Sequence, residues 1–161
     1  MQLRYVVCDP KVCTGCQLCE FACAAAKVGA FCLELSRIRT TRPEPTVSMS
    51  IACRLCQNAP CVAACPRQAL SVNQERGTIT VDKTKCTGCG WCIEACDFGA
   101  IALDPSTKCV VICDLCPDRE QPRCIEICPK QALSLASAEE LAQRARTKLV
   151  KETVASEDRS G

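Results

Sequence analysis

The segment KCTGCGWCIEAC at residues 85–96 decides the fold of this chain, and it closely copies VCTGCQLCEFAC at residues 12–23. A second repeat relates CPRQALSV at residues 65–72 to CPKQALSL at residues 128–135. Internal repetition of this kind indicates a duplicated structural unit. The 161 residues include 19 cysteines and no histidine, so cysteine carries the chemistry that needs explaining.

Sixteen of the cysteines form four runs of four. The first and third runs have the spacing C-x2-C-x2-C-x3-C, and the second and fourth are expanded between their second and third cysteines. The runs are Cys13, Cys16, Cys19 and Cys23; Cys53, Cys56, Cys61 and Cys65; Cys86, Cys89, Cys92 and Cys96; and Cys113, Cys116, Cys124 and Cys128. The remaining Cys8, Cys32 and Cys109 lie in apolar, strand-like stretches, and free cysteine in such a setting is usually a core residue.

The spacing of the runs favours iron–sulfur clusters. Two-residue gaps let a tight loop direct several thiolates at one cluster, and Gly15 and Gly88 tolerate the unusual dihedrals that such a loop requires. The x3 step puts the third and fourth cysteines on one face of a helix, about a turn apart. The runs resemble those of bacterial ferredoxins, in which the fourth cysteine binds the other cluster of a pair. We therefore expect each run to supply a short helix that passes between two clusters.

Other uses of the cysteines fit less well. Disulfides are disfavoured by the odd number of cysteines and by the absence of a recognisable export segment, which leads us to expect a cytoplasmic protein. Zinc sites place C-x2-C pairs further apart and are often completed by histidine. Cys109, Cys113 and Cys116 have radical-SAM spacing, but that use would leave Cys124 and Cys128 without a role.

Composition narrows the function classes. Aromatic residues are 3% of the chain, so a conventional core is small and cluster binding should be coupled to folding. Four all-cysteine clusters would move the formal charge from +2 to about −6, which the 20 Lys and Arg partly neutralise. Arg37, Arg39 and Arg42 are expected to form a solvated face rather than a nucleic-acid site. No apolar run is long enough to span a membrane, and without histidine no convincing nucleophile–base constellation indicates an enzyme.

The segments between the runs predict an α+β chain of short hairpins and helices. A strand is expected at the N-terminus, and predicted hairpins join residues 69–72 with 78–81, 101–103 with 109–112, and 31–38 with 47–51 through a turn-rich segment. Ser137 and Glu140 predict a capping box for a helix over residues 137–150. Its stripe of Leu141, Ala145 and Leu149 fits packing on the body or on a neighbouring subunit. Residues 151–161 are expected to be a flexible tail.

The spacing leaves the pairing of the runs open. The first run can pair with the second and the third with the fourth, or the second and third can pair inside the first and fourth. The four runs, over residues 4 to about 135, resemble the four-cluster polyferredoxin subunits of bacterial and archaeal redox enzymes. Pro60 in the expanded second run and Pro122 in the fourth belong to that resemblance.

The resemblance implies the nested pairing, with residues 1–30 and 104–136 as an outer ferredoxin-like module and residues 31–103 as an inserted one. It implies four [4Fe-4S] clusters with these ligand sets: Cys13, Cys16, Cys19 and Cys128; Cys113, Cys116, Cys124 and Cys23; Cys53, Cys56, Cys61 and Cys96; and Cys86, Cys89, Cys92 and Cys65. The first and third runs carry Ala24 and Asp97 in place of the usual proline. A carboxylate at Asp97 would lower the potential of a neighbouring cluster, or it is a solvated turn residue.

The function implied by the resemblance is a non-catalytic electron-transfer subunit that carries one electron at a time. The favoured catalytic partner is a tungsten- or molybdenum-pterin aldehyde oxidoreductase or formate dehydrogenase, with CO dehydrogenase and hydrogenase types as alternatives. A flavin- or NAD-linked subunit is a further partner. A free polyferredoxin shuttle and a self-associating, filament-forming module are the competing hypotheses. Trp91 is positioned to touch a cluster or a partner, although packing is the simpler interpretation of a single tryptophan.

Overall fold

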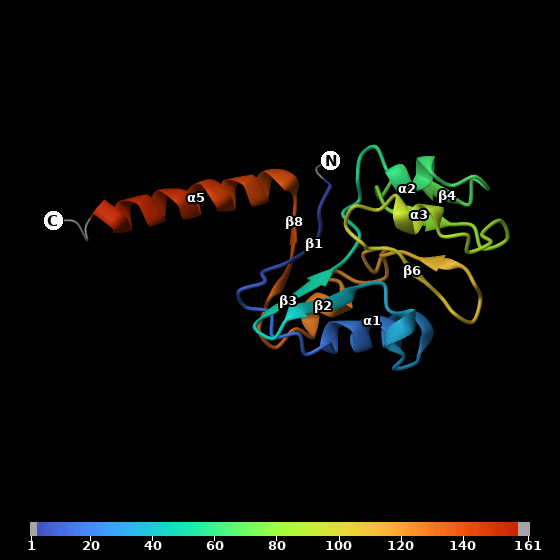
Figure 1. Cartoon of the computed structure of the whole chain (residues 1–161), viewed down its shortest axis with the longest axis horizontal. Helices are drawn as coiled ribbons and strands as arrows, with labels where there is room; N and C mark the ends of the chain where they lie inside the picture. The colour runs from blue at the N-terminus through green and yellow to red at the C-terminus, as the bar shows by residue number, and fades with distance from the viewer. Residues whose placement is uncertain (1–2, 158–161) are drawn as a thin grey trace.

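The computed structural model describes residues 3–157 of the chain (Figure 1). Its fold is α+β and ferredoxin-like, with four separate two-stranded antiparallel sheets joined by short helices, and with one long helix at the C-terminal end. The four sheets pair β1 with β8, β2 with β3, β4 with β5, and β6 with β7. The sheets are small because each run of cysteines interrupts the chain after a few extended residues.

The two ends of the cysteine-rich region meet in one sheet. The strand β1 (Tyr5–Cys8) pairs with β8 (Leu133–Ala136), so that Tyr5 lies opposite Ala136 (Figure 1). Beside this sheet, α1 (Leu18–Val28) packs against the short α4 (Arg123–Glu126). The first and fourth runs are thereby brought together across most of the sequence.

The second and third runs meet in the same way. The short helices α2 (Pro60–Ala63) and α3 (Trp91–Glu94) contact each other. After α2 come β4 (Leu70–Val72) and β5 (Ile79–Val81), and after α3 come β6 (Ala102–Leu103) and β7 (Val110–Val111). Both pairs form antiparallel hairpins, which confirms two of the three predicted hairpins.

The third predicted hairpin is wrong in its first strand. Residues 33–35 form a 3-10 helix (Leu33–Leu35), and the strand is β2 (Arg39–Glu44), which pairs with β3 (Val47–Ile51). The guanidinium of Arg39 donates to the carbonyls of Leu33 and Glu34, which favours the helical turn. Pro43 is accommodated because this sheet has only two strands, so a proline can lie where no ladder hydrogen bond is needed.

The core consists of aliphatic side chains, alanines and cysteines, with no aromatic residue among the buried residues described. Ile38 and Val110 are among the largest fully buried side chains, and nine of the buried apolar residues described are cysteines. An apolar core without aromatic rings, and with a third of its residues cysteine, buries limited apolar surface. A bound inorganic core at each cysteine group would therefore supply much of the cohesion, as it does in other small metal-binding domains.

The C-terminal helix α5 (Ala138–Glu157) extends away from the rest of the molecule (Figure 1). Its capping box is confirmed, since the Ser137 N–H donates to the Glu140 carboxylate at 2.7 Å and lowers the pKa of that carboxyl. The predicted tail from residue 151 is wrong through Glu157 because the helix continues, and residues 158–161 lie outside the described part. Of the predicted stripe, Leu141 is half-buried, whereas residues 143–155 are all exposed, so beyond its first turn α5 does not pack on the body as one interpretation expected. Within residues 3–157, no helix is long and apolar enough to cross a membrane.

Candidate iron–sulfur sites

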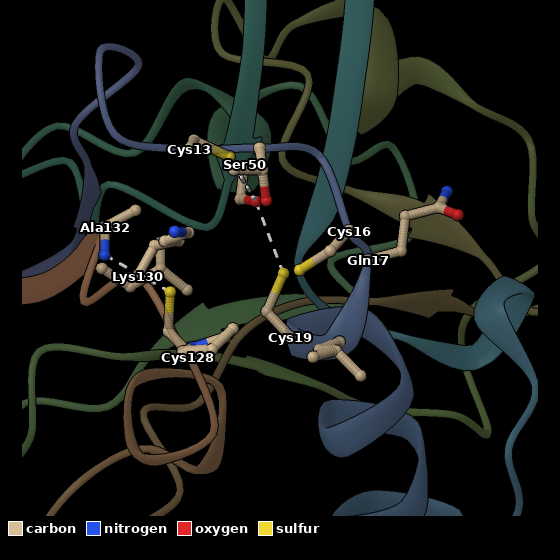
Figure 2. A pocket seen from close by; sticks show the side chains of 12 residues that line it. Cys13, Cys16, Gln17, Cys19, Ser50, Cys128, Lys130 and Ala132 are labelled. Carbon is tan, nitrogen blue, oxygen red and sulfur yellow. Dashed lines mark hydrogen bonds between the residues drawn. The ribbon is translucent and has the colours of Figure 1, made fainter.

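The first cysteine group lines a hollow of about 340 Å³, its open mouth included. Its four sulfurs come from the loop before α1, from α1 itself and from the segment after α4, and they face a common space (Figure 2). The cysteines are Cys13, Cys16, Cys19 and Cys128. Cys16 is exposed, whereas Cys19 is buried. Three cysteines of the first run thus meet the last cysteine of the fourth run.

Two further groups line hollows in the inserted part of the chain. One hollow of about 430 Å³ is lined by Cys53, Cys56, Cys61 and Cys96, together with Arg54 and Asp97. Another of about 280 Å³ is lined by Cys65, Cys86, Cys89 and Cys92. Each of these groups takes three cysteines from one run and the last cysteine of the other. Cys89 is exposed, and Asp97 is an exposed residue at the rim of the first of these hollows.

The remaining four run cysteines are buried together beneath α1 and α4. They are Cys23, Cys113, Cys116 and Cys124. Burial, with the charges of Cys113, Cys23 and Cys116, raises the pKa of the Cys124 thiol. Burial raises the pKa of Cys113 to about 12, with smaller contributions from Cys23, Asp114 and Cys53. The four thiols are therefore close neighbours, and Cys53 places the second-run group beside them.

The loop that presents each group has the same turn in all four runs. The residue two positions after the opening cysteine has a left-handed backbone, with φ of 67° at Gly15, 51° at Leu55, 65° at Gly88 and 61° at Leu115. The prediction that Gly15 and Gly88 serve this turn is confirmed. Leu55 and Leu115 adopt the same conformation without glycine, at an energetic cost of roughly 1–2 kcal/mol each. The turn is thus a property of the run rather than of glycine.

The repeated octapeptides are explained by a second turn. Gln68 and Gln131, three residues after Cys65 and Cys128, have φ of 50° and 51°. This turn directs the next N–H back at the cysteine: Ala69 donates to the Cys65 sulfur and Ala132 to the Cys128 sulfur, each at 3.3 Å. Hydrogen bonds of this kind stabilise thiolate ligands of iron–sulfur clusters and help to set their potentials. The shared sequence of the two segments therefore follows from one hydrogen-bonded loop used twice.

The chemistry of the groups fits [4Fe-4S] clusters. Burial raises the pKa of Cys53 and of Cys92 to about 11 because it removes water from the thiolate, and the charges of neighbouring cysteines add to the shift. A bound metal reverses this cost, because a coordinating thiol is deprotonated outright. In residues 3–157, no three candidate side chains approach closely enough to hold a single metal ion. Three of the hollows are each lined by four cysteines, the ligand number of a [4Fe-4S] cluster.

The three other cysteines differ from one another. Cys109 is buried, as predicted, and its thiol lies 3.6 Å from the carbonyl of Lys83. Cys8 and Cys32 are only half-buried.

Trp91 is 61% exposed, so the packing interpretation of that residue is wrong.

Sequence reasoning missed two polar features beside the groups. Asp114, next to Cys113, binds Lys27 at 2.8 Å and also pairs with Arg37. Burial opposes ionisation of Asp114, but the Lys27 hydrogen bond and the Arg37 charge outweigh it and lower the pKa of Asp114. Arg37 is therefore an ion-pair residue and not part of a solvated face. The second feature is the hydroxyl pair of Thr40 and Ser50. Both are ordinary strand residues, and nothing in the sequence marks them as neighbours of a cysteine.

Comparison with known proteins agrees with the geometry. The profile of the 4Fe-4S dicluster domain family matches residues 46–138. The polyferredoxin-like subunit of an aliphatic sulfonate oxidoreductase of Pyrococcus furiosus is 41% identical over 125 residues, which cover 77% of this chain and 70% of that relative. The thiosulfate reductase electron transfer subunit PhsB of Salmonella typhi is 33% identical over 144 residues, which cover 82% of this chain and 74% of the relative.

A solved structure resembles the fold over nearly the whole chain. A chain of the active site complex BamBC of benzoyl coenzyme A reductase matches with a TM-score of 0.53, over 97% of this chain and 91% of its own length. Its sequence identity is 19%, so the likeness concerns the fold alone.

Proposed function

Since the chain belongs to the 4Fe-4S dicluster family of iron–sulfur electron-transfer subunits, we propose that it carries four clusters as a path between a catalytic oxidoreductase subunit and a second redox partner. Each [4Fe-4S] cluster, when bound, accepts and releases one electron at a time. The chain's own residues hold, space and shield these groups. Its relatives are electron-transfer subunits, and its role is likewise non-catalytic.

The observation that carries the proposal is the convergence of sixteen cysteines into four neighbouring groups. The ligand sets follow the nested pairing: Cys13, Cys16, Cys19 and Cys128; Cys23, Cys113, Cys116 and Cys124; Cys53, Cys56, Cys61 and Cys96; and Cys65, Cys86, Cys89 and Cys92. We name these the first, fourth, second and third groups, after the run that supplies three of their cysteines. The pairing of β1 with β8 supports an outer module of residues 1–30 and 104–136 around an inserted module of residues 31–103.

The groups follow one another in a line. Cys19 and Cys23 on α1 join the first group to the fourth. Cys53 lies beside Cys113 and so joins the fourth group to the second. Cys61 is a close neighbour of Cys96 in the second group and of Cys92 in the third. This order supports a path that runs first, fourth, second, third.

Both ends of that path reach the surface. Among the described run cysteines, only Cys16 of the first group and Cys89 of the third are exposed. Trp91 is exposed next to Cys89. Exposure of a cysteine in each terminal group supports electron entry and exit there, since the described cysteines of the two middle groups are buried or half-buried.

The catalytic partner in our proposal is a tungsten- or molybdenum-pterin enzyme, and the second partner is a flavin- or NAD-linked subunit. The names of the relatives, a sulfonate oxidoreductase subunit and a thiosulfate reductase subunit, support attachment to a catalytic oxidoreductase. The otherwise polar α5 exposes Leu149 (66%), Val150 (62%) and Val154 (52%), and these apolar side chains support a subunit over a freely diffusing shuttle, because exposed apolar side chains favour association.

Anaerobic isolation of the native protein tests this proposal. A subunit should elute in size-exclusion chromatography with a larger catalytic chain that contains a pterin cofactor. A lone monomer at native expression would favour the shuttle, and an open-ended assembly of this chain alone would favour the filament-forming module. Either of those results would contradict the subunit role.

A further inference from the structure

The first group differs from the other three in its hydrogen bonds. The Ser50 hydroxyl lies 3.4 Å from the Cys19 sulfur and 4.0 Å from the Cys13 sulfur (Figure 2). The Thr40 hydroxyl lies 3.5 Å from the same Cys19 sulfur and 2.9 Å from the Ser50 hydroxyl. Thr40 and Ser50 are partners in the β2–β3 ladder. One hairpin therefore lays a pair of hydroxyls over two ligand cysteines.

Once Cys19 is a ligand, a hydroxyl that bonds its sulfur must be the donor. A thiolate has no proton to give and only accepts hydrogen bonds. Each hydroxyl has one hydrogen, so Ser50 and Thr40 either both donate to Cys19, or one donates to the other and the second donates to Cys19. Ser50 is 5% exposed, so water competes little for its hydroxyl. In the other three groups, as far as residues 3–157 show, the donors to cysteine sulfur are backbone N–H groups: Leu55 to Cys53, Ala69 to Cys65 and Arg37 to Cys23.

We propose that the Thr40–Ser50 hydroxyl pair raises the reduction potential of the first group above those of the other three. One-electron reduction adds a negative charge that is shared by the ligand sulfurs, and no proton accompanies it in this scheme. Donors aimed at those sulfurs stabilise the reduced form more than the oxidised form, because a hydrogen bond to a more negative acceptor is stronger. Exposure of Cys16 and of Cys89 allows solvation of the added charge at both ends of the path, so the hydroxyl pair carries the difference between the first and third groups.

A higher potential at the first group would give electron transfer through the chain a preferred direction. Electrons delivered to the third group at the Cys89 end come to rest most favourably at the first group, and they leave the chain there to the higher-potential partner. This inference rests on the proposed function and adds to it which end collects electrons. Thr40 and Ser50 are positioning residues, since they act through Cys19 and Cys13.

The chain contains a matched control. Ser71 and Thr80 are ladder partners in the β4–β5 hairpin with hydroxyls 2.8 Å apart, but this pair is exposed and bonds no cysteine. Ser50→Ala and Thr40→Val remove the hydroxyls over the first group. Ser71→Ala and Thr80→Val remove the same chemistry from the solvent face. Ser50→Thr restores a hydroxyl and serves as the rescue variant.

Anaerobic potentiometric titration with dithionite, followed by electron paramagnetic resonance, tests the inference, with iron content measured on each sample. In Ser50→Ala the highest of the potentials should fall, with about a tenfold loss in the equilibrium constant for reduction, or about 59 mV. The nearly isosteric Thr40→Val should lower the same potential if Ser50→Ala fails to assemble. Ser50→Thr should retain it, and the control variants should leave all potentials in place.

Three outcomes would overturn the inference. If Ser50→Ala and Thr40→Val bind the full amount of iron and the highest potential is unchanged, this inference is refuted and the proposed function is not. Equal shifts in the Ser71→Ala control would show a non-local effect and also refute it. A wild-type chain that holds no clusters would refute both this inference and the proposed function.

Discussion

Replacing Gly88 by alanine should loosen the third group, and the structure gives the reason. Gly88 has φ of +65°, and a Cβ there would lie 2.2 Å from the carbonyl oxygen of Lys108. That carbonyl cannot easily move, because the Lys108 N–H donates to the Asp104 carbonyl at 2.9 Å, and the Asp104 carboxylate is bound by the Ser106 N–H at 2.8 Å. The clash would push the loop that carries Cys86 and Cys89 away from β7.

Gly99 is the matched control. It has φ of +60°, a Cβ there would meet nothing within 4 Å, and the equivalent positions after Cys65 and Cys128 already carry glutamine. Both Gly88→Ala and Gly99→Ala incur roughly 1–2 kcal/mol for a left-handed alanine. Only Gly88→Ala adds a steric cost of roughly 1–3 kcal/mol for displacing backbone. The difference corresponds to about a 5- to 150-fold change in an equilibrium or rate ratio.

The assay is anaerobic release of iron to a chelator, followed by absorbance and by the iron left on the chain. Gly88→Ala should release the iron of one cluster at least about fivefold faster than Gly99→Ala, with the other clusters released at the wild-type rate. Equal release rates in the two variants would refute the reasoning that the Lys108 carbonyl, and not backbone handedness, makes glycine necessary at this position.

Three further predictions address pairing, charge and capping. Cys65→Ser and Cys86→Ser should each remove or degrade one cluster, and the double variant should lose no more iron than either single one, since nested pairing puts both ligands in one group; loss of two clusters in the double variant would support adjacent pairing. Asp114→Asn should speed chelator-driven iron release about tenfold by leaving Arg37 without its carboxylate partner and Lys27 with only the 3.9 Å contact to Asp118, while Asp118→Asn, which removes only that long and exposed contact, should not; equal rates would contradict the ion-pair argument. Ser137→Ala should destabilise the first turn of α5 by about 1 kcal/mol, which hydrogen exchange would detect as about fivefold faster exchange there; unchanged exchange would contradict the capping role.

The sequence is sufficient to predict the local features that depend on the spacing of nearby residues. Gly15 and Gly88 are expected at left-handed turns because the two-residue gap between cysteines demands one. The hairpins of residues 70–81 and 102–111 are expected because short apolar stretches flank turn residues. The capping box at Ser137 follows from residues three apart. Each of these inferences depends only on near neighbours in the chain.

The other features depend on contacts between distant segments. The x3 step says that Cys23 serves a different group from Cys19, but only tertiary structure brings it to Cys113. Pro43 suggests a turn, although a two-stranded sheet tolerates proline in a strand. The Arg37–Asp114 pair spans 77 residues, and the Thr40–Ser50 pair becomes meaningful only when the hairpin lies over Cys19.

Trp91 illustrates a different limit. A single tryptophan in a chain poor in aromatics is expected to fill the core, because burial of a large ring is favourable. The run that contains Trp91 directs Cys89 and Cys92 toward the third group, and this turns the Trp91 side chain outward. Geometry imposed by the ligand cysteines overrides the hydrophobic preference of one side chain.

The most direct test of the account is the amount of iron and acid-labile sulfide bound by each chain after anaerobic preparation. Four [4Fe-4S] clusters predict about sixteen of each per chain. A value near eight or below, in material that remains fully folded, would contradict the claim that all four cysteine groups hold clusters.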